Sequence, residues 1–286
     1  MKIAWIGTGV MGAAMLQHLV KAGHEVHAYN RSYAKAEPLK DCGVIVHKTL
    51  PACVEKAEVI ITMVGYPKDV EEIYRGEQGI FAHAPKGCIM LDMTTSSPSL
   101  AKELEEEAVR KGFSMMDAPV SGGDSGAKAG TLSIMCGGKK EVFEQVKPIL
   151  GCMGKSIHYI GEAGSGQHCK ACNQIAVAGA VAAMSEAIVY ARTNGLDPEV
   201  VLSAISGGAA GSWQINNTAP RVLEEDFAPG FYIKHFIKDM HIVQEAMEAH
   251  DMHLDMLDQV CHMYETLAEN GEEDNGTQAL LHYYKK

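Results

Sequence analysis

Short apolar runs alternate with helical patterns through the first half of the chain. A helix is expected over residues 10–22, where Gly23 provides the left-handed position that commonly ends a helix, and another over residues 99–111. Strands that alternate with helices indicate βαβ units and a mainly parallel sheet. The expected strands are residues 2–6, 25–29, 44–46, 59–64, 89–92 and 113–117.

The second half of the chain has a helical pattern almost to its end. Residues 167–193 form one long expected helix, which is rich in alanine and apolar on much of its surface, as is usual for a buried helix. Asn194 and Gly195 end this helix, and Pro198 opens the next one. Two more helices are expected over residues 240–250 and 256–270.

The change of pattern near residues 161–165 divides the chain into two expected domains. Its 286 residues, 47% of them hydrophobic, are enough for two cores. We expect an α/β domain with a mainly parallel sheet over residues 1–163 and an all-α domain over residues 164–286. Because no Pro- or Ser-rich linker separates them, the long helix is expected to start at the junction.

Charge and composition narrow the possible partners and compartment. The formal net charge of -11 makes binding of nucleic acid or an anionic membrane by bulk charge unfavourable. The eight cysteines follow no framework spacing, so we expect reduced thiols in a cytoplasmic protein. No signal-peptide pattern opens the chain. No uninterrupted apolar run is long enough to span a membrane, since the longest, residues 175–189, is broken by Ser185 and Glu186.

A glycine turn follows the first expected strand and opens the first expected helix. This strand–turn–helix context gives a G-x-G-x-x-G pattern its meaning as a dinucleotide site. The first glycine permits the tight turn, the second lets the backbone approach a pyrophosphate, and the third allows close packing of helix on strand. The helix N-terminus adds amide donors and partial positive charge. The turn reads Gly7-Thr8-Gly9-Val10-Met11-Gly12.

The end of the second expected strand bears on the choice between NADP(H) and NAD(H). An NAD site usually places a carboxylate there for the ribose hydroxyls, but this chain has Asn30-Arg31-Ser32. The Arg31 guanidinium suits a 2′-phosphate, Ser32 can add a hydrogen bond or simply cap the next helix, and Lys35 can add charge. We therefore expect NADP(H) to be preferred, with NAD(H) possible.

Four segments together resemble the β-hydroxyacid dehydrogenase family, which includes 3-hydroxyisobutyrate dehydrogenases, tartronate semialdehyde reductases and glyoxylate/succinic semialdehyde reductases. The segments are residues 7–23, 117–123, 166–173 and 238–240, in the family's order and spacing. The resemblance covers essentially the whole chain. It implies an N-terminal Rossmann domain, an all-helical C-terminal domain and a long helix that joins them.

The resemblance also implies a catalytic lysine. In the family's Gly-x-x-x-Lys-x-x-Asn pattern the lysine is catalytic and the asparagine contributes to the substrate site, and here these are Lys170 and Asn173. Their spacing of three places them on one helical face. An ammonium group can give a proton to a carbonyl oxygen as hydride reaches the carbon, or take it back in the reverse reaction.

Further site residues are implied by the same resemblance. The segment Ser121-Gly122-Gly123 binds the substrate carboxylate, and paired glycines let backbone N–H groups converge on an anion. Thr95 contacts the nicotinamide, Met63 and Val64 pass the cofactor by their backbone, Lys238 lies near the nicotinamide, and Trp213 belongs to the substrate side. The expected partners are a small carboxylate-bearing substrate and further copies of the chain, as a dimer or tetramer.

The leading interpretation is an NADP-dependent dehydrogenase or reductase for a small β-hydroxyacid or semialdehyde. One alternative is an imine-reducing relative, although such enzymes usually lack the lysine found here as Lys170. Another alternative is a non-catalytic NADP(H)-binding sensor. The chain is much too short for a complete 6-phosphogluconate dehydrogenase. The Cys169-Lys170-Ala171-Cys172 stretch is interpreted as a coincidence, so no metal is expected.

Overall fold

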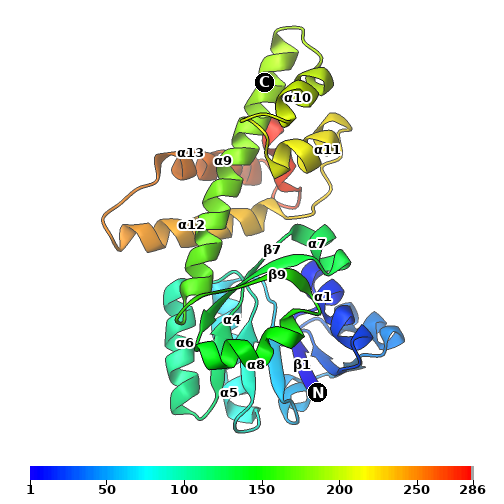
Figure 1. Ribbon diagram of the computed structural model, residues 1–286, viewed down its shortest axis with the longest axis vertical. Coiled ribbons are helices and arrows are strands. Elements are labelled where there is room, and N and C mark those ends of the chain that lie inside the picture. The colour runs from blue at the N-terminus through cyan, green and yellow to red at the C-terminus, as the bar shows by residue number, and fades with distance from the viewer. Residues whose placement is uncertain (285–286) are drawn as a thin grey trace. The chain divides into compact units, whose positions relative to one another are not determined.

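The computed structural model describes residues 1–284 and divides into two compact units. Unit 1 comprises Met1–Lys170, and unit 2 begins at Ala171. The division falls inside one long helix, α9, Ser165–Thr193. Unit 1 is an α/β domain with a Rossmann-type sheet, and unit 2 is helical (Figure 1). The fold class expected from the sequence is therefore confirmed.

A single mixed sheet forms the centre of unit 1. Its strand order is β3-β2-β1-β4-β5-β6-β8-β7, and β9 pairs with β8. The ladders from β3 to β6 are parallel, β8 is antiparallel to both β6 and β7, and β9 is parallel to β8. The strands are β1 Lys2–Ile6, β2 Glu25–Tyr29, β3 Ile45–Val46, β4 Val59–Thr62, β5 Ile89–Asp92, β6 Ser114–Asp117, β7 Val120–Ser121, β8 Leu132–Gly138 and β9 Gly154–Gly161.

The register aligns the carboxyl ends of the central strands. Ile6 pairs with Thr62, Thr62 with Asp92, and Asp92 with Asp117. In parallel sheets of this kind ligands bind beyond the carboxyl ends of the strands. The polar residues that close β4, β5 and β6 therefore lie along the functional edge of the sheet.

Helices cover both faces of the sheet, because residues alternate between two apolar cores. Ile3 and Trp5 pack in one core with α1 and α8, whereas Ala4 and Ile6 pack in the other with α3, α4 and α6. The helices of unit 1 are α1 Val10–Lys21, α2 Tyr33–Ala36, the 3₁₀ helix Glu37–Cys42, α3 Leu50–Val54, α4 Pro67–Arg75, α5 Ile80–His83, α6 Pro98–Arg110, α7 Gly123–Ala129 and α8 Lys140–Leu150.

Unit 2 packs its helices around the continuation of α9. Val181, Met184 and Ile188 enter one core together with Phe236 and Tyr264. Besides α9, its helices are α10 Pro198–Ser206, the π-helical turn Gln214–Thr218, α11 Ala219–Leu223, α12 Ile233–Glu248, α13 Asp255–Glu269 and the 3₁₀ helix Thr277–Tyr284.

By length and composition alone α9 could cross a membrane, a property that it shares with core helices of soluble proteins. The sequence expectation about membrane spans considered only uninterrupted apolar runs. An 18-residue window of α9 has a mean hydropathy of 1.5 even though polar residues interrupt it, which a search for uninterrupted apolar runs does not detect. Of that window, 39% is buried, so the helix is less buried than its composition suggests.

Most expected elements lie within a residue or two of the observed ones, and the differences have local causes. β4 ends at Thr62, not at residue 64, because the Val64 N–H donates to the Thr94 hydroxyl and leaves the ladder. α12 begins at Ile233, not at residue 240. The sequence analysis placed its start too late because polar residues interrupt the apolar pattern of the first two turns. β7, β8 and β9 were missed, since β8 contains two glycines and β9 is polar on its exposed side.

Candidate active site

Two glycines of the turn after β1 are required by the fold itself. Gly7 has φ +98°, and a Cβ atom there would lie 2.1 Å from the Met63 carbonyl oxygen. A Cβ atom on Gly12 would lie 2.1 Å from the Gly7 carbonyl oxygen. That carbonyl also accepts a 2.8 Å hydrogen bond from the Trp5 indole N–H. The close approach of α1 to β1 and β4 therefore depends on both glycines.

The middle glycine, by contrast, is not required by any described neighbour. Gly9 has φ -68°, which any residue adopts, and no described heavy atom lies within 4 Å of a Cβ atom built there. It is the N-cap of α1, whose first turn carries no acidic residue. The neighbouring Thr8 hydroxyl is buried without a hydrogen-bond partner among residues 1–284. An open backbone, a helix N-terminus and an unpartnered hydroxyl fit a dinucleotide pyrophosphate.

Residues 30–35, expected to bind the ribose, have two kinds of role. Asn30 is hydrogen-bonded within the protein, whereas the side chains of Arg31, Ser32 and Lys35 are exposed. The Asn30 side chain accepts from the Thr8 N–H at 3.0 Å and donates to the Ser32 carbonyl at 2.9 Å, so it holds the glycine turn to the end of β2. Ser32 is the exposed N-cap of α2, and Lys35 is exposed within α2. The structure therefore shows a bracing role for Asn30.

Arg31 is largely exposed to solvent. Its side chain is 84% exposed and lies 3.2 Å from Asp69, a residue that the sequence analysis missed. The Asp69 carboxylate also accepts from the Tyr66 N–H at 3.1 Å and thereby caps α4. The ion pair is exposed, so it contributes little to stability and can be exchanged for another anion.

The carboxyl ends of β4 and β5 are joined by a buried polar network. Asp92 accepts from the Thr62 hydroxyl at 2.8 Å and from the Thr94 N–H at 3.1 Å. Burial raises the pKa of the Asp92 carboxyl to about 6, despite these donors. Thr95, expected near the nicotinamide, is partly exposed next to buried Thr94. The network holds the loop that presents Thr95.

The Ser121–Gly123 segment has an unusual backbone. Gly122 has φ +132° and Gly123 has φ +63°, so two successive residues occupy the region that favours glycine. Ser121 ends β7 and is partly exposed, and α7 starts at Gly123. The glycines thus turn the chain sharply from strand to helix, with backbone N–H groups near an accessible serine.

Asp117, at the end of β6, anchors the start of α9. Its buried carboxylate accepts from the Gly164 N–H and the Gln167 N–H, both at 2.8 Å. A Cβ atom on Gly166 would lie 2.7 Å from the same carboxylate, so this glycine permits the contact. Burial raises the pKa of Asp117, although these backbone donors oppose the shift. The second and third segments of the resemblance therefore meet in one hydrogen-bonded cap.

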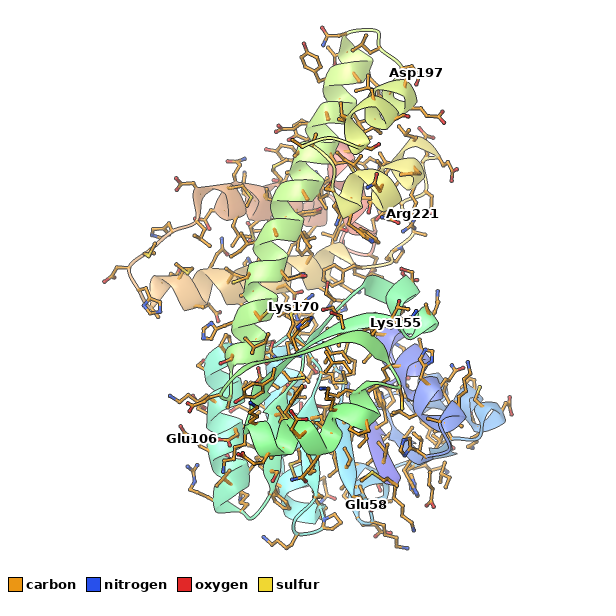
Figure 2. All side chains as sticks on the ribbon, viewed as in Figure 1. Glu58, Glu106, Lys155, Lys170, Asp197 and Arg221 are labelled. Carbon is orange, nitrogen blue, oxygen red and sulfur yellow. The ribbon has the colours of Figure 1, made fainter. Side chains whose placement is uncertain are left out.

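Gln167 ties the same helical turn to the loop after β5. Its side chain accepts from the Ser96 N–H at 3.0 Å and donates to the Thr94 carbonyl at 2.7 Å. Lys170 follows one turn later, is 7% exposed and lies on the N-terminal part of α9 (Figure 2). The loop that carries Thr95 and the turn that leads to Lys170 are thus held together within unit 1.

A second network belongs to unit 2. Asn173 donates to Gln174 at 2.8 Å, Gln174 donates to Asp239 at 2.6 Å, and Lys238 forms a 2.7 Å ion pair with Asp239. Asn173 and Lys238, both expected from the sequence, are thus joined through two buried residues that were missed. Trp213 lies apart on the π-helical turn and is 58% exposed.

Both parts of the chain are similar to known oxidoreductases. Residues 2–161 match the NAD-binding domain of 6-phosphogluconate dehydrogenase, and residues 164–284 match a domain described as NAD-binding of NADP-dependent 3-hydroxyisobutyrate dehydrogenase. An uncharacterized oxidoreductase of Bacillus subtilis is 50% identical over 99% of both chains. The 2-hydroxy-3-oxopropionate reductase of Escherichia coli is 36% identical over 98% of this chain and 96% of the relative.

A solved structure shows the same fold. The 3-hydroxyisobutyrate dehydrogenase of Mycobacterium tuberculosis, solved with L-serine, has a TM-score of 0.91 and 30% identity, covering 100% of this chain and 99% of its own. Fold and site define a nicotinamide dinucleotide-dependent oxidoreductase. The chain belongs to the β-hydroxyacid dehydrogenase family, as its four sequence segments indicate.

Proposed function

We propose that this enzyme interconverts a small β-hydroxyacid and its semialdehyde with Lys170 as the general acid and base. The supporting observation is the placement of Lys170, which is buried one turn beyond a helix start that Asp117 and Gln167 anchor. An ammonium group held in this way can meet a reacting oxygen with little reorganisation.

The bound dinucleotide supplies or accepts the hydride. In reduction, Lys170 donates a proton to the carbonyl oxygen that becomes the hydroxyl, and in oxidation it accepts that proton. The backbone N–H groups of Ser121–Gly123 bind the substrate carboxylate, and Asn173 donates a hydrogen bond to the substrate. The proposed substrates are those that relatives are named for, 3-hydroxyisobutyrate and 2-hydroxy-3-oxopropionate, with L-serine as a related hydroxyacid.

We also propose that NADP(H) is preferred to NAD(H). Arg31 supports this preference because it is exposed beside the end of β2, where no carboxylate occupies positions 30–32. A 2′-phosphate can replace Asp69 as its partner through charge-assisted, bidentate hydrogen bonds. Lys35 adds a second positive charge nearby in the sequence.

A substrate panel with both cofactors tests the proposal. Steady-state oxidation and reduction of each substrate, with Lys170→Ala compared with the wild type, should show kcat reduced by about 10² or more while the Kd for NADPH changes little. Lys155→Ala, on exposed β9, is the matched control. NADPH binding without turnover of any substrate would instead favour the sensor. Near wild-type turnover by Lys170→Ala would refute the role of Lys170 as general acid and base.

We further propose that the enzyme is a homo-oligomer. Large apolar side chains are exposed at the end of α9, in the connection that follows it and in α10, and they are Tyr190, Leu196 and Val200. Exposed apolar groups gathered along one stretch of chain are typical of subunit contacts. Light scattering coupled to size-exclusion chromatography measures the mass directly, and a monomer at micromolar concentration would refute this part.

A further inference from the structure

A cluster on α12 and α13 of unit 2 combines three kinds of metal-binding group. His241 lies on α12, while Cys261 and Glu265 are one helical turn apart on α13. One ligand atom from each lies within 4.8 Å of the other two, and His241 Nε2 is 2.7 Å from Glu265 Oε1. The two helices pack side by side (Figure 1). They therefore bring a nitrogen, a sulfur and an oxygen donor to one point.

We propose that His241, Cys261 and Glu265 bind a divalent cation of the zinc type. Imidazole and thiolate donors select Zn²⁺ or Co²⁺ over Mg²⁺ and Ca²⁺, which prefer oxygen ligands. Bonds of about 2.0–2.3 Å in a tetrahedral site place the donor atoms roughly 3.3–3.8 Å apart. The donors of this cluster need only small movements to reach that spacing.

The exposure of two of the three donors favours binding of an ion from solvent. The side chains of His241 and Glu265 are 48% and 41% exposed, so they can adjust and an ion can reach them from solvent. Cys261 is buried and fixes the inner corner of the site. Three protein donors leave a fourth position for water.

Charge near the thiol also favours a cation. Burial, with the carboxylates of Glu265 and Asp258 on the same helix, raises the pKa of Cys261 to about 12. The charged groups that act on the thiol are thus two carboxylates of α13, and the His241 imidazole of α12 lies next to one of them, Glu265. A cation relieves the repulsion that opposes the thiolate, and it must displace one proton to bind.

The cluster differs from the Cys169-Lys170-Ala171-Cys172 stretch of α9. Those cysteines belong to no three-ligand group among residues 1–284, whereas the cluster draws on two helices and had no sequence motif. A cation there would link α12 to α13 one turn beyond Lys238. The inference does not depend on the proposed reaction, because its readout is spectroscopic.

Cobalt titration of the full-length protein tests the inference. The background is Cys42→Ser/Cys172→Ser, which removes the two exposed thiols. We expect near-ultraviolet thiolate-to-cobalt charge transfer that saturates at one ion per chain and is displaced by Zn²⁺ but not by Mg²⁺. Since one thiol proton leaves, the Kd should tighten about tenfold per pH unit between about pH 7.5 and 9.

Substitutions in the same background show which residues give rise to the charge-transfer band. Cys261→Ser should abolish it, and His241→Ala and Glu265→Gln should each weaken binding at least about tenfold. His262→Ala, exposed beside the cluster on α13, is the matched control and should bind as the background does. If circular dichroism shows that Cys261→Ser does not fold, the His241→Ala and Glu265→Gln variants still test whether the cluster binds the ion. No band, a band that survives Cys261→Ser, or a Kd unchanged by His241→Ala would each overturn the inference.

Discussion

The Asp117 carboxylate accepts the backbone N–H of Gln167 at 2.8 Å and so fastens the end of β6 to the first turn of α9. Its other oxygen accepts the Gly164 N–H. Both oxygens are therefore engaged by backbone donors in a buried setting, where an unmet donor is costly.

Asp117→Asn should weaken this cap. The amide would direct an N–H group at a backbone N–H, so we expect a loss of about 1–3 kcal/mol in the free energy of unfolding. A displaced helix start should also lower kcat about tenfold or more while the Kd for NADPH stays nearly constant. Urea denaturation and steady-state kinetics measure the two effects. Asp255→Asn, exposed to solvent on α13, is the control, and equal effects in both variants would contradict the cap.

Gly9→Ala should separate cofactor binding from folding. No described atom opposes a methyl group at this position, so stability should fall by less than about 1 kcal/mol, the cost of a poorer N-cap. The methyl group would instead meet the pyrophosphate, and the Kd for NADPH should rise at least about tenfold.

Fluorescence titration and thermal unfolding check the Gly9→Ala prediction together. Gly7→Ala is the informative contrast, because its Cβ atom would meet the Met63 carbonyl at 2.1 Å and should destabilise the fold. Unchanged NADPH affinity in Gly9→Ala would argue that the pyrophosphate binds elsewhere.

Arg31→Ala tests the proposed preference for NADP(H). Loss of charge-assisted hydrogen bonds worth about 1.5–3 kcal/mol should lower kcat/KM for NADPH about 10- to 100-fold, while kcat/KM for NADH changes little. The ratio of the two values is the measurement. Arg110→Ala, which removes an exposed arginine at the end of α6, should leave the ratio unchanged. A parallel loss with both cofactors would mean that Arg31 does not read the phosphate.

Asp92→Asn should change how stability depends on pH. Below about pH 4 the Asp92 carboxyl is protonated in the folded and unfolded chain alike. Between about pH 4 and 6 the unfolded chain ionises while the folded chain keeps its proton, because the folded pKa is about 6 against a usual 3.8. The stability of the wild type therefore falls through this window, by about 3 kcal/mol in total.

The asparagine variant lacks this ionisation, so its stability relative to the wild type should rise from pH 4 to 6 and then level off. Both hydrogen bonds to Oδ1 can be kept, since an amide oxygen accepts them equally. Urea titrations of both proteins across pH 4–8 give the difference. A difference that does not vary with pH would show that Asp92 is not buried as a neutral acid.

Local pattern accounts for what the sequence could predict. The glycine turn, its flanking strands and the helix face shared by Lys170 and Asn173 depend on residues close in sequence, and alternation or helical spacing reveals them. The left-handed backbone at Gly7 and Gly122 likewise agrees with a glycine at each position.

Long-range partners account for what was missed. The bonds from Asp117 to the start of α9 span 47 and 50 residues, and the bond from Gln174 to Asp239 spans 65. No spacing rule connects such pairs, and a buried Asp or Gln has no sequence signature without its partner. Asn30 has a bracing role that its position did not reveal, and its expected contact with the cofactor stays a prediction.

The hydrogen bonds by which Gln167 attaches the start of α9 to the loop after β5 have a consequence for the proposed reaction. In the proposed reaction, hydride and proton reach two adjacent atoms of one substrate, and such a reaction is faster when both donors are held in the correct geometry. The Gln167 side chain is hydrogen-bonded to the backbone of both Thr94 and Ser96 inside unit 1, and Lys170 is the last residue of that unit. Lys170, for which we propose the proton transfer, thus directly follows a helical turn that is fixed to the sheet of unit 1. Sequence changes in the helical unit could therefore alter the proposed substrate contacts while this attachment stays the same.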